Sequence, residues 1–288
     1  MAKSGNVLNT ISSLYHSLTK SEKKIADTIL RSPDLVSQCP LSEIAKHLEV
    51  GEATLVRFCR TIGFKGFSDF KLELSIELAT KDNNDETVLE TEIMPSDDSL
   101  TIAQKLQAAV SNVMEETINL LDFKQLEQVV KAIKKARRIF LFGVGSSGVT
   151  AEDAKNKLMR IGFQVDATGN NHFMYMQAAL LTSSDVAIGL SHSGYSAETA
   201  HTLKIAKQNG ATTVALTHSL RSPVTEYADY VLVNGNKQGK LQGDSIGTKI
   251  AQLFVLDLIY ALLVQGEEEL AAQTKQKTLN VILEQRIK

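Results

Sequence analysis

Two short turns rich in glycine and in hydroxyl side chains are the parts of this sequence best suited to bind a ligand. The first is G-V-G-S-S-G at residues 143–148 and the second is S-H-S-G-Y-S at residues 191–196, and each follows an apolar run and opens a helical pattern. Such a turn points backbone N–H groups and the positive end of a helix at an anion. Several hydroxyls and two helix N-termini together favour a phosphomonoester. The candidate phosphate-binding residues are Gly145, Ser146, Ser147, Ser191, His192, Ser193, Gly194 and Ser196.

Two alternatives compete with a phosphate site. The first turn also matches the dinucleotide pattern G-x-G-x-x-G, with Asp166 placed 18 residues after Gly148 as a candidate ribose-binding acid. However, Ser146 and Ser147 would crowd a pyrophosphate that needs close backbone approach, whereas hydroxyls suit a terminal phosphate. The plainer alternative is that glycine and serine only make tight turns and helix caps, as they often do. Two such turns in one domain make that alternative less credible than either turn would alone.

The elements that must position these turns alternate between strand and helix. Helical patterns cover residues 105–121 and 123–136, a helix is expected from about Val149, and another from Ala197 to about Gln208. The predicted strands are residues 139–142, 163–165, 186–190, 213–216 and 230–233. This alternation is typical of a doubly wound parallel sheet in the α/β class, which binds ligands at the carboxyl ends of its strands.

The first 80 residues show only helical spacing of apolar side chains, which predicts an all-α domain. Thr19 followed by Glu22 fits a capping box, so a helix is expected to start near Lys20. Between residues 41 and 71 two short helical patterns are joined by a tight turn at residues 50–51. Their inner faces are Ile44, Ala45 and Leu48 in the first and Leu55, Phe58 and Ile62 in the second. This is the spacing of a helix-turn-helix, whose second helix enters the DNA major groove.

The exposed side of that second helix has suitable residues for contacting DNA. Small side chains at its start admit base edges, and Arg57 and Arg60 can reach bases or phosphates. The expected DNA-contacting residues are Gly51, Glu52, Ala53, Thr54, Arg57, Arg60, Lys65 and Lys71. A plain helical hairpin remains the alternative, because such corners are common and this block is nearly neutral.

Composition and charge bound the possibilities. The 288 residues are 43% hydrophobic with a net charge of −2, which excludes a fully disordered chain and a uniformly basic nucleic-acid binder. Residues 81–104 hold one Lys against seven acidic residues and predict an acidic linker. The expected domains are therefore 1–80, an acidic linker 81–104, and 105–288.

Location and cofactors follow from what the sequence contains. Two cysteines do not make a disulfide framework, and the first residues lack the pattern of a signal peptide, so a soluble cytoplasmic protein without membrane contact is expected. The apolar tract at residues 250–264 is shorter than a membrane span and is more plausible as a core helix than as a subunit interface. The histidines do not stand at metal-ligand spacing, so neither a metal nor a cofactor is expected.

Both halves resemble known domains. The stretch EIAKHLEVGEATLVRFCRTIGFKGFSDFK resembles the N-terminal domain of the RpiR/MurR family of bacterial regulators, although Glu49 replaces the usual turn glycine and Gly51 the usual capping serine. Residues 143–147 and 191–196, with G-T-K-x-x-Q at residues 247–252, resemble the SIS (sugar isomerase) domain, which binds phosphosugars. The residues that match the family's phosphate-contacting hydroxyls are Ser147, Ser191, Ser193 and Ser196, with Ser146 beside them.

The combined resemblance implies a regulator and not an enzyme. It implies a DNA-binding transcriptional regulator of sugar or amino-sugar metabolism whose C-terminal domain senses a sugar phosphate. Its expected partners are double-stranded, palindromic operator DNA and a second copy of the chain, in a homodimer or higher oligomer. The alternative is an aldose–ketose sugar-phosphate isomerase with an accessory helical domain, which needs an acid and a base. The candidates for those roles, His192, Glu198, Asp244 and Lys249, show no diagnostic spacing.

Overall fold

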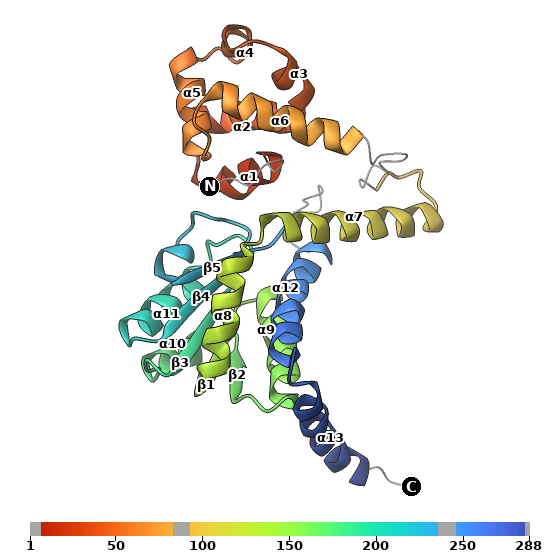
Figure 1. The fold of residues 1–288 in the computed structure, drawn as a ribbon, viewed down its shortest axis with the longest axis vertical. Coiled ribbons are helices and arrows are strands. Elements are labelled where there is room, and N and C mark those ends of the chain that lie inside the picture. The colour runs from red at the N-terminus through yellow and green to blue at the C-terminus, as the bar shows by residue number, and fades with distance from the viewer. Residues whose placement is uncertain (1–6, 83–92, 236–245, 286–288) are drawn as a thin grey trace. The chain divides into compact units, whose positions relative to one another are not determined.

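The computed structural model describes residues 7–82, 93–235 and 246–285, and the chain divides into two compact units, residues 1–109 and 110–288 (Figure 1). Helix α7 (Ser99–Leu120) contributes to both units and begins inside the segment predicted to be a linker. The domain borders expected from the sequence, 1–80, 81–104 and 105–288, stay predictions.

The first unit contains six α-helices before α7 among its described residues, and a short 3-10 helix (Tyr15–Ser17) follows the first of them. They are α1 (Val7–Leu14), α2 (Lys20–Arg31), α3 (Pro33–Gln38), α4 (Leu41–His47), α5 (Glu52–Thr61) and α6 (Phe67–Asp82). The predicted capping box is confirmed, because the Thr19 hydroxyl accepts from the Glu22 backbone while the Glu22 carboxylate accepts from the Thr19 N–H. All six side chains predicted to face inward from α4 and α5 and their flanks are buried. On α2, Ile25 and Ile29 are buried, whereas Leu30 is 39% exposed.

The second unit is a five-stranded, all-parallel sheet with helices on both faces, which confirms the predicted fold class. Its strands are β1 (Arg138–Gly143), β2 (Val165–Thr168), β3 (Asp185–Leu190), β4 (Thr212–Thr217) and β5 (Tyr230–Val233). Its helices after α7 are α8 (Phe123–Lys135), α9 (Ser146–Arg160), α10 (Asn171–Ala179), α11 (Ala197–Gln208), α12 (Ile246–Val264) and α13 (Glu268–Glu284).

The strand order β2-β1-β3-β4-β5 creates two hydrophobic layers. Alternate strand residues such as Ile139 and Leu141 pack against α8, α9 and α12, whereas their neighbours Phe140 and Phe142 pack against α10 and α11. Figure 1 shows these two groups of helices on opposite sides of the sheet. A period of two along each strand therefore makes both faces apolar, as a buried parallel sheet requires.

Three predicted elements have clearly different boundaries in the structure, the first being the helix expected at residues 105–121, which is α7 and begins at Ser99. The strand expected at 163–165 is β2 at Val165–Thr168, and the helix expected from Val149 begins at Ser146. Strand β2 lies at the edge of the sheet, so Asp166 is exposed and the strand lacks the continuous apolar run that marks a central strand.

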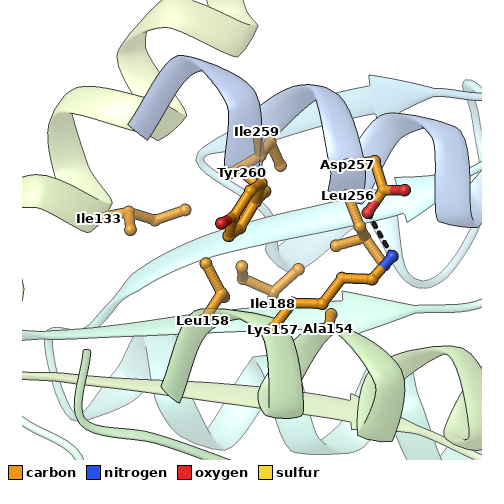
Figure 2. A pocket seen from close by; sticks show the side chains of 9 residues that line it. All are labelled: Ile133, Ala154, Lys157, Leu158, Ile188, Leu256, Asp257, Ile259 and Tyr260. Carbon is orange, nitrogen blue, oxygen red and sulfur yellow. Dashed lines mark hydrogen bonds and ion pairs between the residues drawn. The ribbon is translucent and has the colours of Figure 1, made fainter. Parts of the chain in front are cut away.

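By length and composition alone, helix α12 could cross a membrane. In the structure it packs into the hydrophobic core of the sheet domain. Its residues Ala251, Val255, Leu256 and Ile259 are buried, three of them in the core shared with α8 and α9, which confirms the expectation of a core helix. A cavity of about 10 Å³ lies between α12, α9 and β3, with the Lys157–Asp257 ion pair among its lining (Figure 2). That volume holds about one water molecule, so the cavity is too small for a sugar phosphate.

A buried carboxylate ties the amino ends of β1 and β3 together. Asp185 is 1% exposed and accepts hydrogen bonds from the guanidinium groups of Arg137 and Arg138 and from the backbone and hydroxyl of Thr182. Burial opposes the charge of Asp185, but the bonds from Arg138, Arg137 and Thr182 outweigh burial and hold its pKa well below the usual range. The carboxylate therefore stabilises the folded sheet.

We expect Asp185→Asn to lower the free energy of unfolding by about 2 kcal/mol at neutral pH, the scale of a hydrogen bond to a charged group. Because the folded-state pKa is depressed, this contribution is fully present above the unfolded pKa of about 4 and is lost as the pH falls below it. Urea unfolding of both proteins between pH 3 and pH 8 measures the difference. A difference that stays constant down to pH 3 would contradict the assignment.

Candidate functional site

The two serine turns meet because of the strand order. Strands β1 and β3 are neighbours, and Gly143 at the end of β1 is in register with Leu190 at the end of β3. The chain leaves β1 towards α9 on one face and leaves β3 towards α11 on the other. The turns at 143–148 and 191–196 therefore flank the topological switch point of the sheet, where doubly wound folds bind ligands.

The first turn depends on Gly145. This residue is the N-cap of α9 and has φ 58° and ψ −130°, a conformation that side chains strongly disfavour. The sharp turn lets α9 begin directly at Ser146, so the backbone N–H groups of Ser146 and Ser147 belong to the first turn of the helix. These groups lack intrahelical acceptors and are suited to an anion.

The hydroxyl of Ser147 is held by a residue far along the chain. Ser147 is 9% exposed, and its Oγ accepts a hydrogen bond of 3.2 Å from Nε2 of Gln252 on α12. Gln252 is itself 1% exposed. Since the Ser147 hydroxyl acts as an acceptor in this contact, its proton remains for donation to a ligand oxygen. The sequence placed Gln252 in the G-T-K-x-x-Q stretch without giving it a partner.

The second turn is organised by hydrogen bonds to its own serines. Ser191 Oγ accepts from the backbone of Ser196 and Ser193 Oγ accepts from the backbone of Tyr195. Ser196 is the N-cap of α11, where its hydroxyl accepts from the Thr199 backbone and contacts the Glu198 carboxylate at 3.1 Å. Ser191 and Ser193 thus keep a donor proton for a phosphate, while Ser196 serves mainly as the helix cap.

Gly194 is required for this second turn to close. It has φ 76°, and a Cβ atom there would lie 2.2 Å from the hydroxyl of Ser222 and 3.1 Å from that of Thr217. The chain after β4 therefore packs directly against the turn. The same segment also holds His192 in place, because the His192 carbonyl accepts hydrogen bonds from the His218 N–H and from the Thr217 hydroxyl. The sequence did not assign Thr217 or His218 to the site.

The groups considered for isomerase chemistry have different surroundings in the part of the chain that the structure describes. Hydrogen bonds from its own backbone N–H and from the Ser196 hydroxyl lower the pKa of Glu198, which weakens it as a base. The Nδ1 atom of His192 is 3.2 Å from the Asn234 amide nitrogen. Lys249 is exposed, and Asp244 lies outside the described residues. Within those residues no cluster of three or more potential metal ligands occurs.

The helix-turn-helix of the first unit has the geometry expected from its sequence. The turn after α4 contains Glu49 at φ 54°, and α5 begins after Gly51, which makes no side-chain cap. Leu55, Phe58 and Cys59 point into the core, whereas Glu52, Ala53, Arg57 and Arg60 are exposed and Thr54 is half-buried. The α5 residues predicted to contact DNA are therefore not part of the buried face of the helix.

The basic residues around α5 have different surroundings. Lys65 is exposed, and its carbonyl accepts from Arg60 Nε at 3.3 Å. The ammonium of Lys71 donates to the carbonyls of Gln38 and Cys39, at 3.2 and 2.9 Å, and so satisfies the C-terminal end of α3. Lys71 has a structural role that the sequence did not indicate, and its contact with DNA stays a prediction.

The left-handed conformation of Glu49 gives a stability prediction. A non-glycine residue there costs about 1 kcal/mol, and the exposed ion pair between Glu49 and Lys24 at 3.2 Å offsets little of it. We expect Glu49→Gly to be about 0.5–1 kcal/mol more stable than Glu49→Ala, which loses the same ion pair but keeps the strain. Thermal unfolding of the helical domain followed by circular dichroism measures this, and equal stabilities would refute the strain.

Comparison with known proteins agrees with both halves. Residues 5–81 match the model of the helix-turn-helix domain of the rpiR family, and residues 132–262 match that of the SIS domain. An uncharacterised helix-turn-helix transcriptional regulator of Haemophilus influenzae is 93% identical over 288 residues, the full length of both chains.

Solved structures extend this likeness. The Vibrio vulnificus NanR protein, solved in complex with ManNAc-6P, is 25% identical, with a TM-score of 0.62 over 98% of this chain and 100% of that one. A Listeria monocytogenes protein proposed to be a sugar-phosphate isomerase is 18% identical, with a TM-score of 0.55 over 62% of this chain and 98% of that one. At 18% identity this second likeness shows the fold of the sheet domain alone.

Proposed function

The chain belongs to the rpiR family of helix-turn-helix transcriptional regulators with a C-terminal SIS domain, and we propose that its effector site is formed by the two serine turns. In this proposal the protein is cytoplasmic, binds operator DNA through α5 and binds a sugar phosphate between β1 and β3. The observation that carries the effector site is the register of Gly143 with Leu190, from which both turns extend with helix N-termini behind them.

The chemistry of the turns supports a phosphate as the group they hold. A phosphomonoester carries about 1.5 to 2 negative charges at neutral pH and offers only acceptor oxygens. The turns offer backbone N–H groups at the starts of α9 and α11 and the hydroxyls of Ser147, Ser191 and Ser193. NanR carries ManNAc-6P and matches 98% of this chain, which supports a phosphorylated amino sugar as effector.

We also propose that the regulator works as a homodimer on a palindromic operator. One helix-turn-helix reads one half-site, and two copies related by a two-fold axis read two half-sites spaced by whole turns of DNA. The DNA-contacting residues proposed are those on the exposed side of α5 with the basic residues after it. Light scattering of the protein on a selected operator tests this, and a monomer on the DNA would contradict it.

A thermal-shift screen tests the effector class. Full-length protein is heated with pentose, hexose and amino-sugar phosphates, including ManNAc-6P, N-acetylmannosamine 6-phosphate. A ligand at 100 times its dissociation constant adds about 2.7 kcal/mol to the free energy of unfolding. The proposal requires at least one sugar phosphate to stabilise the protein when the unphosphorylated sugar does not. The proposal would be overturned if none of the sugar phosphates tested stabilised the protein.

The isomerase alternative predicts turnover, and we expect none. The depressed pKa of Glu198 and the hydrogen-bonded ring of His192 disfavour proton abstraction from a sugar carbon. Proton exchange at C2 of hexose and pentose phosphates, followed by NMR in deuterated water, is the sensitive measurement. Steady exchange that is lost in Glu198→Gln would instead establish the enzyme.

A further inference from the structure

A third hydroxyl-rich turn, T-H-S-L-R-S at residues 217–222, follows β4 and supports the second serine turn. Its Thr217 hydroxyl and His218 N–H both donate to the His192 carbonyl, at 3.2 and 2.9 Å. The neighbouring strand β5 ends beside it, because the Asn234 N–H donates to the Thr217 carbonyl at 3.0 Å. Hydrogen bonds therefore join the segments that follow β3, β4 and β5 into one buried polar network.

Hydrogen bonds fix the orientation of the Asn234 side chain. Its Nδ2 donates to the Gly235 carbonyl at 2.9 Å, and a carbonyl can only accept, so the amide cannot be turned around. The same NH₂ group lies 3.2 Å from Nδ1 of His192, which must then be the acceptor. The Asn234 carboxamide oxygen consequently points away from these partners as a fixed acceptor.

Two side-chain oxygens in this network are buried without a hydrogen-bond partner among residues 7–82, 93–235 and 246–285. They are Oδ1 of Asn234, a residue with 0% exposure, and Oγ of Ser219, a residue with 2% exposure. Ser219 is held through its backbone, since its N–H donates to the Thr217 hydroxyl at 3.2 Å. A buried polar group left unpaired costs about 1–3 kcal/mol, so both atoms are suited to partners that arrive with a ligand.

Ser219 and Asn234 follow β4 and β5, so they lie at the same edge of the sheet as the two serine turns. Parallel strands lie about 4.8 Å apart, so β4 and β5 are one and two spacings from β3. A phosphate held between β1 and β3 leaves the carbon skeleton of a sugar free to extend along the strand ends. We propose that Ser219 and Asn234 bind the hydroxyl or amide groups of that skeleton while the serine turns hold the phosphate.

This assignment rests on the proposed sugar-phosphate function. It predicts that binding of the phosphate and binding of the sugar skeleton can be measured separately. Calorimetry on the full-length protein measures the affinity for two probes, ManNAc-6P and inorganic phosphate. We expect Ser219→Ala to weaken ManNAc-6P about three- to tenfold, the scale of one neutral hydrogen bond, with inorganic phosphate unchanged. Because the hydroxyl has no protein partner in the described chain, the melting temperature without ligand stays the same or rises.

Ser222→Ala is the matched control. Ser222 is buried in the same turn, but its hydroxyl donates to the Ser219 carbonyl at 3.3 Å. We expect its removal to lower the melting temperature and to leave the ratio of the two affinities unchanged. Like Ser219→Ala, Asn234→Ala should lower the affinity for ManNAc-6P more than the affinity for inorganic phosphate. Operator binding by the Asn234→Ala protein verifies that it is folded.

The outcomes separate this inference from the function beneath it. Wild-type protein that binds neither probe contradicts the proposed function and this inference together. Wild-type protein that binds ManNAc-6P no more tightly than inorganic phosphate, or a Ser219→Ala protein that keeps the wild-type ratio, overturns this inference alone. A Ser219→Ala protein that melts at a lower temperature and keeps its ManNAc-6P affinity would show that the hydroxyl is structural.

Discussion

Replacing Ser147 or Ser191 with alanine is expected to weaken binding of the sugar-phosphate effector by about ten- to a hundredfold. Each hydroxyl would donate to a charged phosphate, and such a bond contributes about 1.5–3 kcal/mol. Ser147 lies on α9 and Ser191 follows β3, so the two changes remove donors from opposite sides of the same group. The double variant should lose more than a hundredfold, although residues that share a ligand oxygen need not act additively. Calorimetry with the sugar phosphate identified by the thermal-shift screen measures each loss.

Ser184→Ala is the control for these serine changes. Ser184 is exposed and precedes β3 at the opposite end of the strand from Ser191. It should bind the effector as the wild type does. A double variant of Ser147 and Ser191 with full effector affinity would show that the serine turns do not hold the phosphate.

The same variants separate effector binding from DNA binding. An effector changes operator affinity only if it binds the free and DNA-bound conformations differently. Ser147 and Ser191 lie outside the helix-turn-helix, so operator affinity without effector should stay within about a factor of two. The effector concentration needed to change operator affinity should rise by the same factor as the loss in effector affinity.

The fold was predictable where the chain carries regular patterns. The central strands β1, β3 and β4 are buried on both faces and therefore appear as continuous apolar runs. Strand β2 was misplaced because Asp166 and Thr168 interrupt that pattern at the sheet edge. The early start of α9 depends on Gly145 at positive φ, a conformation that a G-S-S stretch permits but does not specify.

The site was predictable only where its residues are close in sequence. Both serine turns are local motifs, and the strand order alone brings them together. Gln252 reaches Ser147 across 105 positions, and no periodicity encodes such a contact. The T-H-S run at residues 217–219 was visible after a predicted strand, and its similarity to the other two turns was the available signal. Asn234 follows β5 as a single polar residue and gave no such signal.

Arg57→Ala is expected to lower operator affinity by about 1–3 kcal/mol, or roughly five- to 150-fold, if its guanidinium pairs with a base edge. Arg57 is exposed on α5, one helical turn after Ala53, where a second helix would enter the major groove. The loss should be largest on the preferred operator and smaller on unrelated DNA, because only base contacts carry sequence information. Fluorescence anisotropy on an operator enriched from a random library measures both.

Lys65→Ala should give a different result on the same DNA. Lys65 is exposed beyond the end of α5, which suits a phosphate contact. Loss of one phosphate contact weakens binding to all sequences alike and reduces the slope of log affinity against log salt by about 0.9. Lys131→Ala, which removes an exposed lysine from α8 in the other domain, controls for the change in net charge. Unchanged affinity in both Arg57→Ala and Lys65→Ala would refute α5 as the DNA-reading helix, whereas a uniform loss in both would assign the two residues to the DNA backbone.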